Sequence, residues 1–141
     1  AAYVAFSPLG RGFLTNKLHD TSQMVEHDLR QTMPRFNADN YPANLSLLPA
    51  YVKLAQHQGC TPAQLALAWV IAQGDNVITI PGTQNLGHLE ENIGANDLVL
   101  DAEVVVQLDA LINQHTVHGA RYNDRAQASV STERFSAEHQ E

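Results

Sequence analysis

The stretch VITIPGTQNLGHLEEN, Val77 to Asn92, decides which fold this chain is expected to adopt. It opens with a short run rich in β-branched residues and almost without polar alternation, the pattern of a strand buried on both faces in a parallel sheet. Pro81 and Gly82 end that run, and an amphipathic pattern follows from Leu86 to Gly94. The stretch therefore predicts a strand, a loop and a helix.

The loop between that strand and that helix carries Thr83, Gln84 and Asn85. Their hydroxyl and amide groups stand where the helix begins, and the unpaired backbone N–H groups of a helix N-terminus favour anions. The loop thus suits a phosphate group. An ordinary strand-to-helix turn with a polar N-cap would carry the same residues, so two interpretations stay open.

A second strand is expected near the start of the chain, at Tyr3 to Ser7. It is followed by the glycines Gly10 and Gly12 on either side of Arg11. Glycines allow a ligand to approach the backbone, and a guanidinium supplies the charge that phosphate prefers. A surface turn with a solvated Arg is the alternative. We predict that the two strands are parallel neighbours joined by a right-handed crossover.

The segments between and after these strands are expected to be helical. Thr61, Pro62 and Gln64 form a capping box with proline at the first helical position. We expect Trp69 in the core and, in the helix after the second strand, Leu89 and Ile93 facing inward. The helices are predicted over Leu45 to Gln58, which Gly59 ends, over Pro62 to Gln73, and after Asp101 with a buried stripe of Val104, Val105, Leu108, Leu111 and Ile112. Residues 15–44 lack a sustained period and are expected to lie over a binding site.

Composition narrows the classes of partner. The chain has 141 residues and a net charge of −7, with no basic stripe for nucleic acid. Cys60 is the single cysteine, and no apolar run approaches the roughly 18 residues of a membrane span. We expect no nucleic-acid or membrane partner and a cytoplasmic location. Because the chain lacks an initiator Met and starts in an apolar run, we expect it to be part of a longer protein.

No catalytic set is visible in the sequence. The closest histidines, His115 and His118, have no Cys, Asp or Glu at a spacing that would complete a metal site. Glu90 and Glu91 are adjacent on one helix and point about 100° apart, so they cannot act together as acid and base. We therefore predict no catalytic residue and no metal ligand.

Several motifs together resemble one family. AFSPLGRGFL (Ala5 to Leu14), PRFNADN, TPAQLALAWVIAQ and ITIPGTQNLGHLEENIGA look like the carboxyl-terminal part of an aldo-keto reductase, in the subfamily related to potassium-channel β subunits. The resemblance implies the α/β fold of a (β/α)8 TIM barrel, of which this chain supplies about the last two strands with their helices plus an extra helix. It covers residues 1–122, and residues 123–141 are expected to form a polar, flexible tail.

The resemblance also implies residues that bind the nicotinamide half of a dinucleotide cofactor. Phe6 takes the place of the aromatic residue that stacks on the nicotinamide ring. Ser7, Leu9 and Arg11 match positions around the pyrophosphate. The implied cofactor is NADP(H), with NAD(H) not excluded.

The adenosine half is assigned to the strand–loop–helix stretch. Thr83, beside Gly82, matches the residue that bonds the phosphate near the adenosine ribose, and Glu91 and Asn92 match the residues that hold adenine.

Gln84, Asn85 and His88 match positions that are often basic in the family. A neutral amide makes an uncharged contact with a 2′-phosphate, so the resemblance leaves the preference for NADP over NAD open.

The family's catalytic tetrad of Asp, Tyr, Lys and His has no matching positions in this chain. Two functional interpretations follow. In one, the intact parent is an oxidoreductase that reduces aldehydes or ketones to alcohols, and this chain supplies part of its cofactor site. In the other, the parent is a non-catalytic cofactor-binding or regulatory subunit like the potassium-channel β subunits. In either case we expect the chain alone to be inactive and poorly stable.

Overall fold

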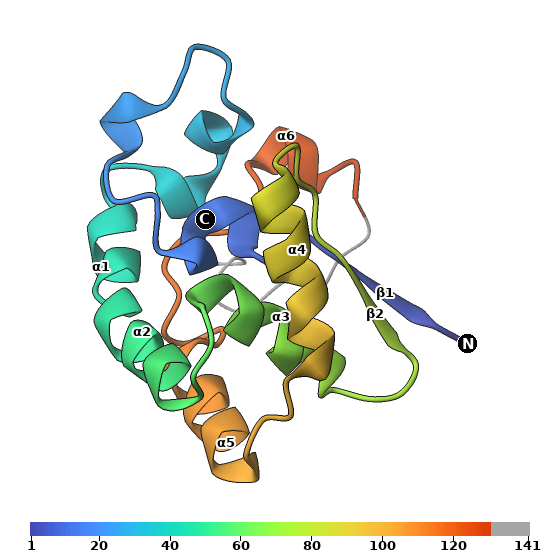
Figure 1. Cartoon of the computed structure of the whole chain (residues 1–141). Coiled ribbons are helices and arrows are strands. Elements are labelled where there is room, and N and C mark those ends of the chain that lie inside the picture. The colour runs from blue at the N-terminus through green and yellow to red at the C-terminus, as the bar shows by residue number, and fades with distance from the viewer. Residues whose placement is uncertain (131–141) are drawn as a thin grey trace. The chain divides into compact units, whose positions relative to one another are not determined.

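The computed structural model describes residues 1–130, which divide into two compact units (Figure 1). The first unit joins Ala1–Leu18 to Leu48–Leu111. The second joins His19–Leu47 to the chain from Ile112 onward. Among the described residues, no helix is both long enough and apolar enough to cross a membrane.

The sheet of the first unit consists of two parallel strands, β1 (Tyr3–Phe6) and β2 (Val77–Ile80). Tyr3 pairs with Val77 and Phe6 with Ile80, so the predicted parallel pairing is confirmed. The predicted burial of the second strand on both faces is wrong for this chain, because Ile78 and Ile80 are each 52% exposed. The helix over Pro62–Ile71 packs against β2.

Helix α3 (Pro62–Ile71) forms the core of the first unit and lies between α2 and α4 (Figure 1). Its capping box is confirmed, since the Thr61 hydroxyl accepts from the Gln64 N–H at 3.2 Å and the Gln64 side chain accepts from the Thr61 N–H at 3.1 Å. Leu65 is fully buried and Leu67 nearly so. The helix ends two residues before the predicted Gln73, because its last turn tightens ahead of Gly74.

Helix α2 (Leu48–His57) is shorter than the predicted segment 45–58. Pro49 lacks an N–H and favours the first turn of a helix, so a new helix begins at Leu48. The residues before it belong to a separate short helix, α1 (Tyr41–Leu45), in the second unit. The predicted stop at Gly59 is confirmed, with φ +65° in the left-handed region.

Helix α4 (Leu86–Gly94) has the predicted bounds, but its predicted inward face is wrong. Leu89 and Ile93 are exposed, and the buried residue of the helix is Asn92. Near the end of α4, an added Cβ on Gly94 would lie 2.9 Å from the Gln64 amide nitrogen, so this part of the helix lies close to α3. The helix therefore buries a face next to the stripe of Leu89 and Ile93 and not that stripe itself.

Helix α5 (Ala102–Leu111) packs against α2 through Val104 and Leu108, which are buried as predicted. Asp101 stands at its start, where its carbonyl accepts from the Val104 and Val105 N–H groups. Val105, Leu111 and Ile112 are only half-buried, so the buried stripe is narrower than predicted. Trp69 is also half-buried rather than in the core, because its indole N–H donates to Asp109 at 2.8 Å.

The second unit is built from short elements around the buried side chain of Asn44. Its amide donates to the carbonyls of Arg35 and His118, at 3.0 and 2.9 Å, and its carbonyl oxygen accepts from the His118 N–H at 2.8 Å. The elements are η2 (Thr21–Gln23), η3 (Leu29–Thr32), η4 (Pro34–Phe36), α1 and α6 (Asp124–Gln127). Residues 15–44 thus contain short helices, although the sequence there shows no sustained hydrophobic periodicity that would predict them.

Helix α6 lies within the predicted polar tail. Asn123 caps it by accepting from the Ala126 N–H at 2.9 Å, so the start of the tail is locally ordered. Residues 131–141 of that tail lie outside the described residues, and the prediction of flexibility stays a prediction.

Candidate functional site

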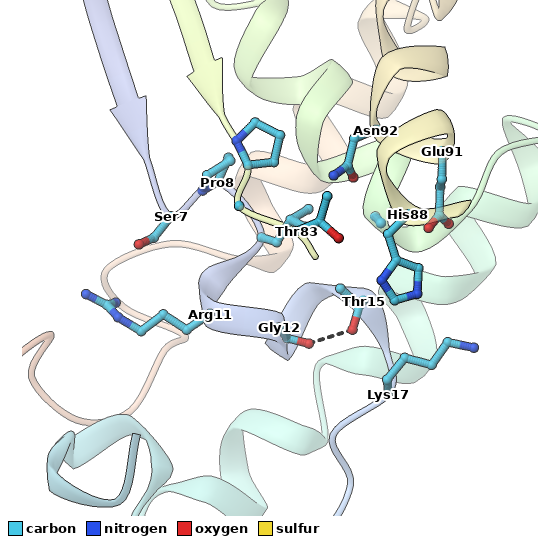
Figure 2. Close-up of a pocket in the computed structure, with 14 residues that line it drawn as sticks. Ser7, Pro8, Arg11, Gly12, Thr15, Lys17, Thr83, His88, Glu91 and Asn92 are labelled. Carbon is cyan, nitrogen blue, oxygen red and sulfur yellow. Dashed lines mark hydrogen bonds between the residues drawn. The ribbon is translucent and has the colours of Figure 1, made fainter. Parts of the chain in front are cut away.

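The loops that leave the carboxyl ends of β1 and β2 meet at a pocket of about 420 Å³ in the first unit (Figure 2). Parallel strands bring these ends to the same edge of a sheet, which is where open and barrel α/β folds bind ligands. The lining residues are Ser7, Pro8, Leu9, Arg11, Gly12, Thr15, Lys17, Ala63, Pro81, Gly82, Thr83, His88, Glu91 and Asn92.

The first loop turns tightly because several of its residues adopt left-handed backbone. Gly10 and Gly12 have φ +56° and +90°, which costs glycine little. Ser7 and Arg11 adopt the same region, with φ 50° and 56°, although a side chain is strained there. The Thr15 hydroxyl donates to the Gly12 carbonyl at 2.7 Å and closes the short helix η1 (Gly10–Thr15). Such strain concentrates at ligand-binding sites.

The second loop is fixed by two side-chain caps. The Thr83 hydroxyl accepts from the Asn85 N–H at 3.1 Å, and the Asn85 side chain accepts from the His88 N–H at 3.1 Å. Asn85 is therefore the N-cap of α4. The N–H groups of Leu86 and Gly87, in the first turn, have no acceptor within the helix and face outward from its N-terminus. The expected polar N-cap is confirmed, and binding of an anion at this helix end stays a prediction.

Three residues of α4 present one face to the pocket: His88, Glu91 and Asn92 (Figure 2). Their spacing of three and four residues places them side by side on a helix. Asn92 is 7% exposed as a residue and lines the pocket. Among the described residues no buried side-chain nitrogen or oxygen lacks a hydrogen-bond partner, so its amide is no buried orphan; it offers donors and an acceptor at the edge of the pocket.

The structure brings most of the predicted site residues together. All of them line the pocket except Phe6, Gln84 and Asn85. Gln84 and Asn85 line an open hollow that shares Gly82, Thr83 and His88 with the pocket. Phe6 lines neither; it ends β1 with 42% of its surface exposed.

Sequence reasoning missed Lys17, which lines the pocket just after η1. The sequence feature that could have pointed to it is a cationic side chain a few residues after Gly10 and Gly12. In Figure 2 the Arg11 side chain extends away from Thr15, Lys17 and His88. Arg11 and Lys17 both line the pocket with the carboxylate of Glu91, although the chain carries a net charge of −7. This lining favours an anionic ligand.

Ala63, from the first turn of α3, also lines the pocket and was not predicted to do so. It is buried, and no polar group or loop position marks it in the sequence.

Other reactive groups of the first unit do not take part. Burial raises the pKa of the Cys60 thiol, which donates to the Ala55 carbonyl at 3.6 Å and stays protonated at neutral pH. Among residues 1–130, no three His, Cys, Asp or Glu side chains gather as metal ligands.

Sequence comparison shows the family to which this chain is similar. Residues 1–113 match the aldo/keto reductase family. The aldo-keto reductase str7 of Strobilurus tenacellus is 40% identical over 118 residues, covering 84% of this chain and 35% of that protein. The aldo-keto reductase yakc [NADP(+)] of Schizosaccharomyces pombe is 39% identical over 127 residues, covering 90% and 37%.

Among solved structures, the glycerol dehydrogenase AKR11B4 from Gluconobacter oxydans superposes with a TM-score of 0.74 at 27% identity, covering 85% of this chain and 36% of that one. The chain spans about a third of the length of the curated relatives that it matches. Its two parallel strands, with helix between them, fit part of a (β/α)8 barrel. The chain belongs to the aldo/keto reductase family.

Proposed function

We propose that this chain is the carboxyl-terminal part of an oxidoreductase barrel and supplies part of its NADP(H) site. The parent enzyme then reduces aldehydes or ketones to alcohols. Three findings support this proposal: the family match over residues 1–113, the parallel pairing of β1 with β2, and the coverage of about a third of each relative.

The observation that carries the proposal is Asn92, whose amide side chain lines the pocket beside Glu91 and Thr83 (Figure 2). An amide offers both donors and an acceptor, which match the edge of an adenine ring. Glu91, one residue before it, adds a carboxylate acceptor for an exocyclic amine. This donor and acceptor set fits the adenine end of the cofactor.

The phosphate groups of the cofactor have two sets of partners. The left-handed loop with Arg11 suits the pyrophosphate, and we add Lys17 to that set because it lines the same pocket. Thr83 and the N-terminus of α4 suit the phosphate on the adenosine ribose. Each of these residues would bind and orient, and none would accept or donate a proton.

Bound nicotinamide would supply the hydride that a carbonyl carbon accepts. In this chain, Phe6 is assigned to stack on that ring, on the basis of the family resemblance. The residues that protonate the carbonyl oxygen are not matched in this chain, so they would come from elsewhere in the parent. We expect the chain purified by itself to show no reductase activity.

Replacing Asn92 with Leu tests the site directly. We expect NADPH to bind roughly 3- to 30-fold more weakly, since one or two hydrogen bonds are lost. Stability should not fall, because leucine places an apolar side chain at a position that is 7% exposed. Fluorescence titration of the natural polypeptide that contains this chain measures the affinity. Asn96→Leu is the control: Asn96 caps the Ile93 carbonyl at 2.9 Å but lies outside the pocket, so its NADPH affinity should stay unchanged. Unchanged affinity in Asn92→Leu would refute the site.

Gln84 determines the preference between the two cofactors. It replaces a family cation in the hollow beside the α4 N-terminus. The 2′-phosphate then relies on Thr83 and the helix N-terminus, so we expect weak discrimination between NADPH and NADH. Gln84→Lys should strengthen NADPH by roughly 1 to 2 kcal/mol, the scale of a charge-assisted bond, and leave NADH nearly unchanged. Titration of both cofactors checks this, and equal gains for both would place residue 84 away from the 2′-phosphate.

Measurements on the same proteins distinguish the proposed enzyme from the second interpretation, a regulatory subunit. A parent that binds NADPH through Asn92 but reduces no aldehyde or ketone would be a regulatory cofactor-binding subunit, as the resemblance to potassium-channel β subunits allows. A parent with NADPH-dependent carbonyl reduction is the enzyme that we propose.

A further inference from the structure

The side chain of Gln64 joins two helix ends in the first unit. Its amide oxygen accepts from the Thr61 N–H at 3.1 Å and completes the capping box of α3. Its amide nitrogen donates to the Glu91 carbonyl of α4 at 3.1 Å. A single side chain therefore ties the start of α3 to the last turn of α4.

The Glu91 carbonyl needs such a donor. It is among the last four carbonyls of α4, which have no regular partner inside a helix. The Ala95 N–H, which would reach it in a longer helix, bonds instead to the carbonyls of Asn92 and Ile93. The Gln64 amide satisfies the carbonyl that this tightened turn leaves open.

Gly94 lies at the same junction. It lies inside α4 with ordinary helical φ, so its backbone does not require glycine. An added Cβ would lie 2.9 Å from the Gln64 amide nitrogen, closer than real Cβ contacts come. Glycine at position 94 therefore leaves room for the Gln64 amide against α4.

We propose that Gln64 is a positioning residue for the cofactor: through the Glu91 carbonyl it fixes the register of α4 against α3, and so places Glu91 and Asn92 at the pocket. This inference rests on the proposed cofactor site. Gln64 itself does not line the pocket, whereas its neighbour Ala63 and the two α4 residues do (Figure 2). Its effect on binding is therefore exerted through the backbone of α4.

Three variants separate positioning from simple stability. Gln64→Glu keeps the capping box, for which Glu is a standard residue, but cannot donate to the Glu91 carbonyl. Gly94→Ala crowds the same amide without adding charge, and alanine also favours the helix. Thr61→Ala removes the N-cap hydroxyl but leaves the Gln64–Glu91 bond in place.

The measurements are the Kd for NADPH, the KM and kcat, and the urea unfolding midpoint, on the natural polypeptide that contains this chain. We expect Gln64→Glu and Gly94→Ala each to raise the Kd and KM for NADPH roughly three- to ten-fold, the equivalent of one hydrogen bond, with kcat at saturating NADPH unchanged. Their unfolding midpoints should stay near wild type. Thr61→Ala should lower the midpoint and leave the Kd unchanged.

The outcomes distinguish failure of the positioning role of Gln64 from failure of the proposed function. Wild-type protein that does not bind NADPH would overturn the proposed function. Wild-type binding with an unchanged Kd in both Gln64→Glu and Gly94→Ala would overturn the positioning role alone. A Kd that follows the unfolding midpoint through all three variants would also overturn it, since Gln64 would then act only on stability. A weaker Kd in Gln64→Glu but not in the uncharged Gly94→Ala would assign the effect to added charge and overturn it too.

Discussion

Gly119→Ala is expected to destabilise the second unit by roughly 2 to 5 kcal/mol, the sum of a left-handed backbone penalty and overpacking. Gly119 has φ +86°, and an added Cβ would lie 2.7 Å from the Asn40 amide nitrogen and 2.9 Å from backbone atoms of Arg35 and Pro34. The Gly119 carbonyl also accepts from the Arg35 side chain at 3.1 Å. Backbone atoms cannot move aside as a flexible side chain can, so the segment around Asn44 would have to open.

Hydrogen exchange read by mass spectrometry checks this result. Protection should fall in segments 34–44 and 113–119 and stay unchanged in α3. Gly59→Ala is the matched control, since Gly59 has φ +65° but nothing within 4 Å of an added Cβ. Gly59→Ala should lower the free energy of unfolding only by the cost of a left-handed backbone at alanine, on the order of 1 to 2 kcal/mol. If Gly119→Ala and Gly59→Ala lost the same free energy of unfolding, the close contacts around Gly119 would not contribute.

Leu65→Ala is expected to cost about 2 to 5 kcal/mol of unfolding free energy in the first unit, the range for a fully buried leucine that leaves a cavity. Leu65 is 0% exposed and lies in α3, which contacts β2, α2 and α4. Loss of packing there loosens the helix against which both pocket loops are held, so NADPH binding should weaken as well.

Urea unfolding followed by circular dichroism measures this cost. Leu86→Ala is the control, because the same side chain at the start of α4 is 70% exposed. Its truncation should change stability by less than about 0.5 kcal/mol, as exposed substitutions usually do. A loss in Leu86→Ala as large as in Leu65→Ala would show that this face of α4 is covered by another part of the natural polypeptide.

The sequence predicted helix caps and helix ends well because these features depend on residues that are close together in the chain. The capping box at Thr61 and Gln64, the stop at Gly59 and the bounds of α4 all follow from hydrogen bonds and backbone angles within a few residues. Arg11 and Thr83 were predicted from the two loops, since parallel strands bring their carboxyl ends together, whereas Ser7 and Leu9 were assigned through the family resemblance.

Tertiary structure alone decided which faces are buried. Leu89 and Ile93 look like an inward stripe, yet they are exposed and the neighbouring Asn92 is buried, while α4 lies close to α3 at Gly94 and Gln64. Lys17 reaches the pocket because the left-handed turns from Ser7 to Asn16 fold the chain back, and no periodicity encodes such turns. Periodicity reports how apolar a face is, whereas burial depends on which neighbour can come closest, and that is set by small residues and long-range hydrogen bonds.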